Sequence, residues 1–153
     1  MRVEYVNPFV DAAVQVLTST VSEYVKREEL VLRPKITPAM GVTVIVGLAG
    51  QISGRVIIDM SRETGLKIAS TMNDEELTEY DELAISTITE LANMITGKAV
   101  TWLTELGFQF DITPPALFIG DNIQISGNNV EVMVVPIELP QGRIEISMSK
   151  KRS

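Results

Sequence analysis

One long amphipathic segment constrains what this chain can fold into more than any other feature. Between about Glu79 and Leu106, apolar residues recur every three or four positions, and Gly107 follows. This spacing predicts a helix about 40 Å long. The residues expected to face the core are Ala84, Ile88, Leu91, Ile95, Ala99, Trp102 and Leu106. The opposite face gathers Ser86, Glu90, Asn93 and Gly97, where a surface helix normally carries solvated Lys and Glu.

An earlier segment predicts a second helix near the start of the chain. Asn7 and Pro8 are residue types favoured at a helix start, and apolar residues then recur at helical spacing. We therefore expect a helix from this point to about Lys26. The polar, proline-containing stretch Glu28–Pro38 is expected to be a connector.

The remaining elements are expected to be strands and one short helix. Ser61 is expected to cap a helix that runs to about Met72, and Thr78 with Asp81 resembles a capping box before the long helix. Runs rich in β-branched residues indicate strands. These strands are Val42–Gly47, Gly54–Met60, Leu117–Ile119, Ile123–Ser126, Val130–Glu138 and Arg143–Met148.

Two short matches suggest that the chain contains an internal repeat. Ile36-Thr37-Pro38 recurs as Ile112-Thr113-Pro114, and the glutamine-containing stretch Gly47–Gly54 resembles Gly120–Gly127. Each half then consists of a helix, a proline connector and a hairpin. The expected fold is an α/β, pseudo-symmetric sandwich in which long helices pack on a mainly antiparallel sheet. Residues 1–149 are expected to form a single domain, followed by a basic tail over residues 150–153.

Composition excludes several classes of function. The 153 residues include no His and no Cys, which removes imidazole bases, thiol nucleophiles, disulfides and the usual zinc ligands. The net charge of −7 gives no electrostatic footprint for nucleic acid and suits an anionic membrane surface poorly. The longest apolar stretch, Val42–Gly50, is far shorter than a membrane span. We expect a cytoplasmic protein without a nucleic-acid or membrane partner.

Glu90 and Asn93 are the residues best suited to carry chemistry. Residues three apart on a helix are neighbours on one face, so a carboxylate and a carboxamide lie together. A carboxamide both donates and accepts hydrogen bonds, so it can hold a water and a phosphoryl oxygen at once. Taken alone, a Glu-x-x-Asn pair is usually solvated surface. A carboxylate metal site at Asp74, Glu75, Glu76 and Glu79 is a further alternative, although acidic residues are also favourable near a helix start.

The combined pattern resembles the CheC/CheX/FliY phosphatases of bacterial chemotaxis, and most of all their CheX members. The family pattern is Ser or Asp, Glu four residues later, Asn three after that, and a Pro about twenty residues on. Ser86, Glu90, Asn93 and Pro114 match it in register. The resemblance extends from Asn7 to about Met148 and implies a CheC/CheX-like sandwich.

The resemblance implies dephosphorylation of a phosphorylated CheY-type receiver domain. Asn93 is then expected to orient the attacking water, and Glu90 to pair with the receiver's active-site Lys. Mg²⁺ is expected on the receiver, with no cofactor belonging to this chain. The expected partner-binding residues are Ser86, Met94, Gly97, Val100 and Pro114. A homodimer joined at a sheet edge is also implied, and the alternating strand through Ile144, Ile146 and Met148 is a candidate edge. The alternative is a non-catalytic adaptor that binds a response regulator or the flagellar motor.

The sequence departs from the CheC-type pattern in its first helix. CheC-type members carry a second Glu-x-x-Asn there, but the internal repeat maps Glu90 and Asn93 onto the apolar residues Val14 and Leu17. Glu4-x-x-Asn7 has the same residue types at the same spacing, but Pro8 follows it, so we interpret Asn7 as a helix cap. We therefore expect a single site, on the long helix.

Overall fold

The computed structural model describes residues 3–34, 39–51, 53–121, 123 and 129–151, and these form one antiparallel sheet and three helices. The helices are α1 (Val3–Thr20), α2 (Arg62–Asn73) and α3 (Glu82–Glu105). The long strands are β3 (Gly41–Gly50), β4 (Gly54–Ser61), β7 (Asn129–Leu139) and β8 (Gly142–Lys151). The short strands are β1 (Lys26–Arg27), β2 (Val31–Arg33), β5 (Phe110–Ile112) and β6 (Ala116–Ile119).

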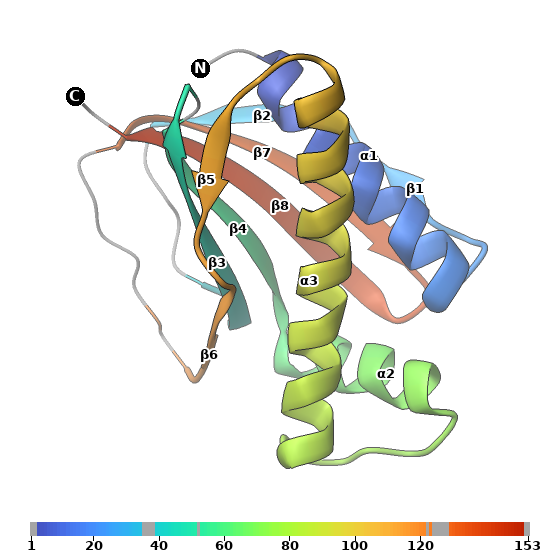
Figure 1. The fold of residues 1–153 in the computed structure, drawn as a ribbon. Coiled ribbons are helices and arrows are strands. Elements are labelled where there is room, and N and C mark those ends of the chain that lie inside the picture. The colour runs from blue at the N-terminus through green and yellow to red at the C-terminus, as the bar shows by residue number, and fades with distance from the viewer. Residues whose placement is uncertain (1–2, 35–38, 52, 122, 124–128, 152–153) are drawn as a thin grey trace.

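The sheet is antiparallel and its two halves are built alike. The strand order is β1-β7-β8-β4-β3-β5, with β2 also paired to β7 and β6 also paired to β3. Each half contributes a helix, two short strands and a hairpin. The short strands of the first half pair with β7 of the second, and those of the second half pair with β3 of the first. The predicted pseudo-symmetric sandwich is therefore confirmed, with α1 and α3 on one face of the sheet (Figure 1).

The core lies between that sheet face and the two long helices. Alternate residues of the long strands face inward, and α1 and α3 supply the other side of the cluster. The fully buried large side chains include Phe9 and Leu17 of α1, Leu91 and Ile95 of α3, and Ile137 of β7. Packing of α1 against α3 and the sheet fixes the direction in which the remaining face of α3 points.

The first helix begins earlier and ends earlier than its sequence signals predict. It starts at Val3, so Pro8 lies inside it and Asn7 is not a cap. Burial of Val6 beneath the first turns compensates for the hydrogen bond that Pro8 cannot donate. The helix ends at Thr20, and Tyr24 beyond it is 72% exposed.

The prediction that Glu28–Pro38 is only a connector was wrong in part, because Val31–Arg33 form strand β2. Strand β1 lies just before this stretch. Both strands are too short to show a hydrophobic period, and they exist because β7 pairs with them. Residues 35–38 lie outside the described residues, and with them the first copy of the Ile-Thr-Pro match. The expected strand Ile123–Ser126 also lies almost wholly outside them, and Ile123 itself is not in a strand.

Both predicted hairpins, β3–β4 and β7–β8, are present, but the internal repeat places the second one too early in the chain. The second hairpin is β7–β8, whose turn lies at Pro140 and Gln141, well beyond the Gly120 match. Strand β8 also takes in Lys150 and Lys151, the first half of the expected tail.

Strand β8 cannot be the dimer edge that the alternating pattern suggested. It lies in the middle of the sheet between β7 and β4, and Ile144, Ile146 and Met148 are each 1% exposed. The alternation therefore reflects a strand that packs one face on the core. The outer strands of the described sheet are β1 and β2 on one side and β5 and β6 on the other.

Candidate functional site

The long helix starts three residues later than predicted and exposes the face expected to carry the site. Asp81 is its N-cap and accepts a hydrogen bond from the Ala84 N–H at 2.9 Å, which replaces the predicted capping box at Thr78. Gly107, with φ of +96°, follows its last turn. The predicted core face is buried from Ala84 to Ala99, while Leu106 lies past the helix end and is 65% exposed.

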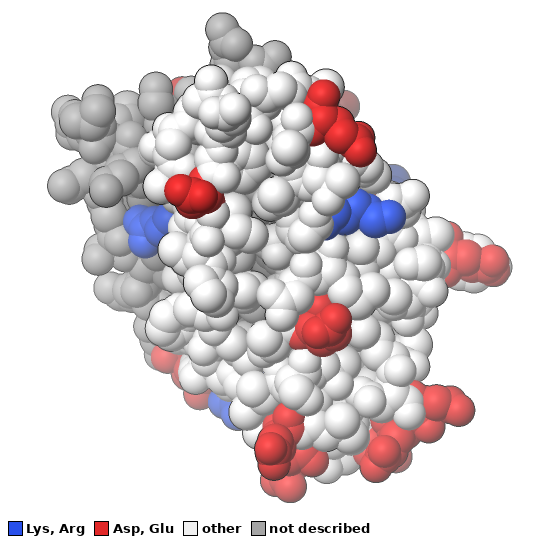
Figure 2. All heavy atoms as spheres, viewed as in Figure 1, with Lys and Arg blue, Asp and Glu red and all other residues white. Residues whose placement is uncertain are grey.

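Four predicted site residues come together on the exposed face of α3. Ser86, Glu90, Asn93 and Gly97 are all exposed. They recur three or four residues apart, so they form one row along the helix. Helix α3 crosses the molecule in front of the sheet in Figure 1. Figure 2, viewed from the same side, shows a mostly uncharged surface on which a few acidic and basic side chains stand apart.

Glu90 and Asn93 have free functional groups. Within the described part of the chain, neither side chain makes a hydrogen bond or an ion pair. Lys98 lies on the same helix, but its Nζ donates to Gln15 Oε1 at 2.7 Å and lies 5.7 Å from the centre of the Trp102 ring. The Glu90 carboxylate therefore remains available to a cation from outside, and the Asn93 carboxamide to both a donor and an acceptor.

Ser86 and Gly97 lie at the two ends of the row that contains Glu90 and Asn93. The Ser86 hydroxyl donates to the Leu83 carbonyl at 3.1 Å, so its proton is used within the helix. A Cβ placed on Gly97 would meet nothing within 4 Å. Packing inside this chain therefore does not require a glycine at this position, although glycine costs about 1 kcal/mol relative to Ala in a helix interior.

The apolar members of the predicted contact set differ in exposure. Met94 is 36% exposed, whereas Val100 is half-buried. Leu83 and Ile85, each 39% exposed, also project from α3, and sequence reasoning did not single them out. Their positions in the apolar pattern gave no signal, because a Leu or Ile on a helix is ordinarily interpreted as core.

Pro114 lies on a different element from the other predicted residues. It is exposed in the loop between β5 and β6. Thr113 beside it holds this loop to β3: its N–H donates to the Gly47 carbonyl at 3.0 Å, and its Oγ1 accepts from the Gly47 N–H at 2.7 Å. The loop is thus anchored by Thr113, a role that the sequence motif did not indicate.

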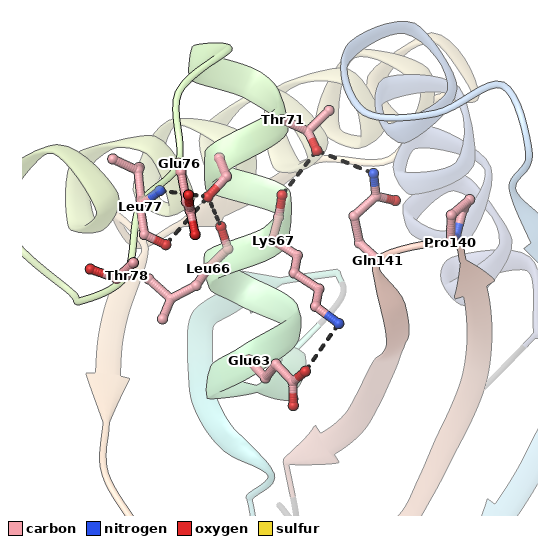
Figure 3. Close-up of a pocket in the computed structure, with 10 residues that line it drawn as sticks. Glu63, Leu66, Lys67, Thr71, Glu76, Leu77, Thr78, Pro140 and Gln141 are labelled. Atoms are coloured by element: carbon pink, nitrogen blue, oxygen red, sulfur yellow. Dashed lines mark hydrogen bonds and ion pairs between the residues drawn. The ribbon is translucent and has the colours of Figure 1, made fainter.

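The site is an exposed helix face and not a cavity. A hollow of about 550 Å³ lies between α2, the segment after it and the β7–β8 turn. Glu76 of the alternative metal site lines it, but none of the predicted catalytic or partner-binding residues does. Figure 3 shows two pairs among its polar groups: Lys67 pairs with Glu63 at 3.0 Å, and Gln141 Nε2 donates to Thr71 Oγ1 at 3.2 Å. We assign no chemistry to it.

The alternative of an acidic metal site finds no support in the geometry. Over the ranges that the structure describes, no three acidic side chains form a group that could hold a metal ion. Asp74 instead ends α2 in the left-handed conformation, with φ of +50°. Among the same residues, no helix is both long and apolar enough to cross a membrane.

Comparison with known proteins gives concordant results. The family model of the chemotaxis phosphatase CheX matches residues 42–138. The CheY-P phosphatase CheX of Thermotoga maritima is 40% identical over 96 residues, which cover 62% of this chain and 61% of that protein. The match therefore spans less than two thirds of the relative's length.

Solved structures extend the likeness over nearly the whole chain. The CheX–CheY–BeF3–Mg²⁺ complex from Borrelia burgdorferi is 40% identical, with a TM-score of 0.81, and covers 99% of this chain and 100% of that one. A CheC-like superfamily protein from Shewanella sp. PV-4 is 26% identical, with a TM-score of 0.86 and the same two coverages.

Proposed function

The chain belongs to the CheX family of chemotaxis phosphatases, and from this membership we propose that it hydrolyses the aspartyl phosphate of a CheY-type response regulator. The observation that carries the proposal is the exposed pair Glu90 and Asn93, whose functional groups no described residue occupies. The Thermotoga relative is a CheY-P phosphatase, and the Borrelia structure holds CheX together with CheY, BeF3 and Mg²⁺. Both support a phosphorylated receiver domain as the substrate.

Asn93 orients the attacking water in this proposal. Its carboxamide oxygen accepts a hydrogen bond from the water, and its N–H donates to a phosphoryl oxygen. The water attacks phosphorus in line with the bond to the receiver's Asp. That P–O bond breaks, which leaves inorganic phosphate and the free carboxylate. An acyl phosphate is already labile, so correct placement of the water supplies most of the acceleration.

Glu90 anchors the receiver. Its carboxylate pairs with the receiver's active-site Lys, which brings Asn93 to the phosphoryl group. The Mg²⁺ belongs to the phosphorylated receiver, and this chain contributes no ligand to it. The remaining contacts to the receiver are proposed for Ser86, Met94, Gly97, Val100 and Pro114.

A homodimer is the second part of this proposal. Because β8 is central, a dimer joined through strands would use an outer edge of the sheet. Strands β5 and β6 offer one, on which Ile112 is 39% and Phe118 is 46% exposed. Exposed apolar side chains on an edge strand favour pairing with a second copy.

The test is phosphate release from a phosphorylated CheY-type receiver with catalytic amounts of this protein. We expect many turnovers with the wild type and a loss of about a hundredfold in kcat with Asn93→Ala, while binding of the receiver persists. Asn7→Ala is the matched control. It removes the same carboxamide from α1, where Asn7 Oδ1 accepts from Arg27 Nη2 at 2.8 Å, and we expect unchanged turnover.

Two outcomes contradict the proposal in different ways. Wild-type rates in Asn93→Ala would remove Asn93 from the mechanism. Stoichiometric binding of one receiver per chain, with no acceleration of phosphate release, would instead indicate the non-catalytic adaptor.

A further inference from the structure

Two exposed apolar side chains flank Glu90 along α3. Met94 follows Glu90 by four residues and Leu83 precedes it by seven, which places them about 40° and about 20° from Glu90 around an ideal helix. They are 36% and 39% exposed. Ile85 is also 39% exposed, but it lies about 140° from Glu90 around the same helix.

The neighbours of Glu90 along the exposed row of α3 are uncharged. Ser86 and Asn93 adjoin it in the same row, and the nearest cation along the helix, Lys98, is engaged by Gln15. The free chain therefore presents a single carboxylate between two apolar side chains. A helix face with one carboxylate between two exposed apolar side chains is unusual for a solvated helix, which normally carries charges of both signs.

Such an arrangement matters for the strength of an ion pair. A solvent-exposed salt bridge contributes little, because water and salt screen it. The same pair contributes more when neighbouring contacts exclude water around it. Leu and Met are suited to this, and the flexible thioether of Met adapts to the shape of a partner surface.

We propose that Leu83 and Met94 pack against the receiver on either side of Glu90 and exclude water from its ion pair with the receiver's Lys. The inference rests on the proposed function: it adds Leu83 to the proposed contacts and gives both Leu83 and Met94 a positioning role. Leu83 and Met94 touch neither the phosphoryl group nor the attacking water. Their contribution is to the affinity for the receiver, and through it to the resistance of that affinity to salt.

The experiment measures KM and kcat for phosphate release at ionic strengths of about 0.05 M and about 0.5 M. Leu83→Gln and Met94→Gln keep side-chain length and a good helix former while removing apolar character. We expect each substitution to raise KM about three- to tenfold and to leave kcat unchanged. KM should also rise more steeply with salt than in the wild type, since the ion pair is then open to screening.

Ile85→Gln is the matched control, because Ile85 is as exposed as Leu83 on the same helix but faces away from Glu90. Its KM and salt dependence should equal those of the wild type. In a Glu90→Gln background, Met94→Gln should no longer alter the salt dependence, because no ion pair remains to be shielded.

Two results would overturn the inference while the wild type still turns over. One is an equal rise in KM for Ile85→Gln, which would indicate a general loss of apolar surface. The other is a wild-type salt dependence in Leu83→Gln and Met94→Gln. Absence of turnover by the wild type itself would instead remove the proposed function, so the two failures are distinguishable.

Discussion

Helices α1 and α3 occupy equivalent places in the two halves of the fold, but they treat their polar side chains differently. On α1, Asn7 and Asp11 both bind Arg27, and Gln15 accepts from Lys98. On α3, within the described residues, Glu90 and Asn93 bind nothing. In the same architecture, Asn7, Asp11 and Gln15 of α1 are therefore engaged within the fold, whereas Glu90 and Asn93 of α3 remain available to a partner.

The difference also extends to the positions that the internal repeat equates. Leu17, which the repeat aligns with Asn93, is fully buried between α1 and the rest of the core. Val14, aligned with Glu90, is half-buried. At these two aligned positions α1 is thus turned toward the core, whereas Glu90 and Asn93 on α3 are exposed.

The largest expected effect comes from forcing a carboxamide onto α1. Leu17→Asn removes a buried apolar side chain and leaves a polar group without a partner, so we expect the free energy of unfolding to fall by about 4 kcal/mol. Urea unfolding followed by circular dichroism measures this loss. Thr18→Asn, at the exposed neighbouring position, should change it by no more than about 0.5 kcal/mol. A loss below about 1 kcal/mol in Leu17→Asn would mean that α1 tolerates the side chain that we assign to α3 alone.

A second experiment compares the two exposed acids directly. Glu90→Ala should raise KM for the phosphorylated receiver about tenfold, equivalent to about 1.4 kcal/mol, with no loss of stability. Asp11→Ala breaks the 3.1 Å ion pair with Arg27, so it should cost about 0.5 kcal/mol of stability and leave KM unchanged. Steady-state phosphate release and urea unfolding distinguish the two. Equal effects of both variants on KM would break the contrast between the helices.

The smallest effect concerns Gly97, whose missing side chain the fold does not require. Gly97→Ala should raise the free energy of unfolding by about 0.5–1 kcal/mol, because Ala favours the helix and its methyl group meets nothing in the free chain. KM should rise about threefold, because the receiver packs where the methyl group now projects. A more stable variant with an unchanged KM would exclude close approach of the receiver at this position.

Gly107→Ala is the control for this substitution. A Cβ there also meets nothing within 4 Å, but φ of +96° disfavours any residue other than glycine. We expect it to lose stability where Gly97→Ala gains it, with KM unaffected. Thermal unfolding measures the gain in stability of Gly97→Ala and the loss in Gly107→Ala, and steady-state kinetics measures KM for both variants.

The sequence predicts the long elements well, because their patterns are local. The β3–β4 hairpin, the helix capped by Ser61, and the exposed row on α3 all follow from periodicity and capping residues. Strands β1, β2 and β5 could not be predicted, since they form through pairing with residues far along the chain. The start of α1 was misjudged because burial of Val6 outweighs the helix-start signal at Pro8.

For the site, periodicity places Glu90 and Asn93 outward but cannot show that they are free. Availability depends on where the cations go, and Arg27 and Lys98 both bind side chains of α1. Nothing local in the sequence reveals these contacts. The same holds for the anchoring of the β5–β6 loop by Thr113, which depends on the position of Gly47 in another strand.

The exchange of short strands between the halves has a consequence for how the chain is made. Strand β2 pairs with Val132–Val134, which a ribosome adds about a hundred residues later. Until then the nascent first half carries strands without neighbours and an uncovered apolar hairpin, the kind of surface on which chaperones act. Pairing over such separations also slows folding. The sheet can therefore be completed only after the chain has been translated through β8, which joins β7 to β4.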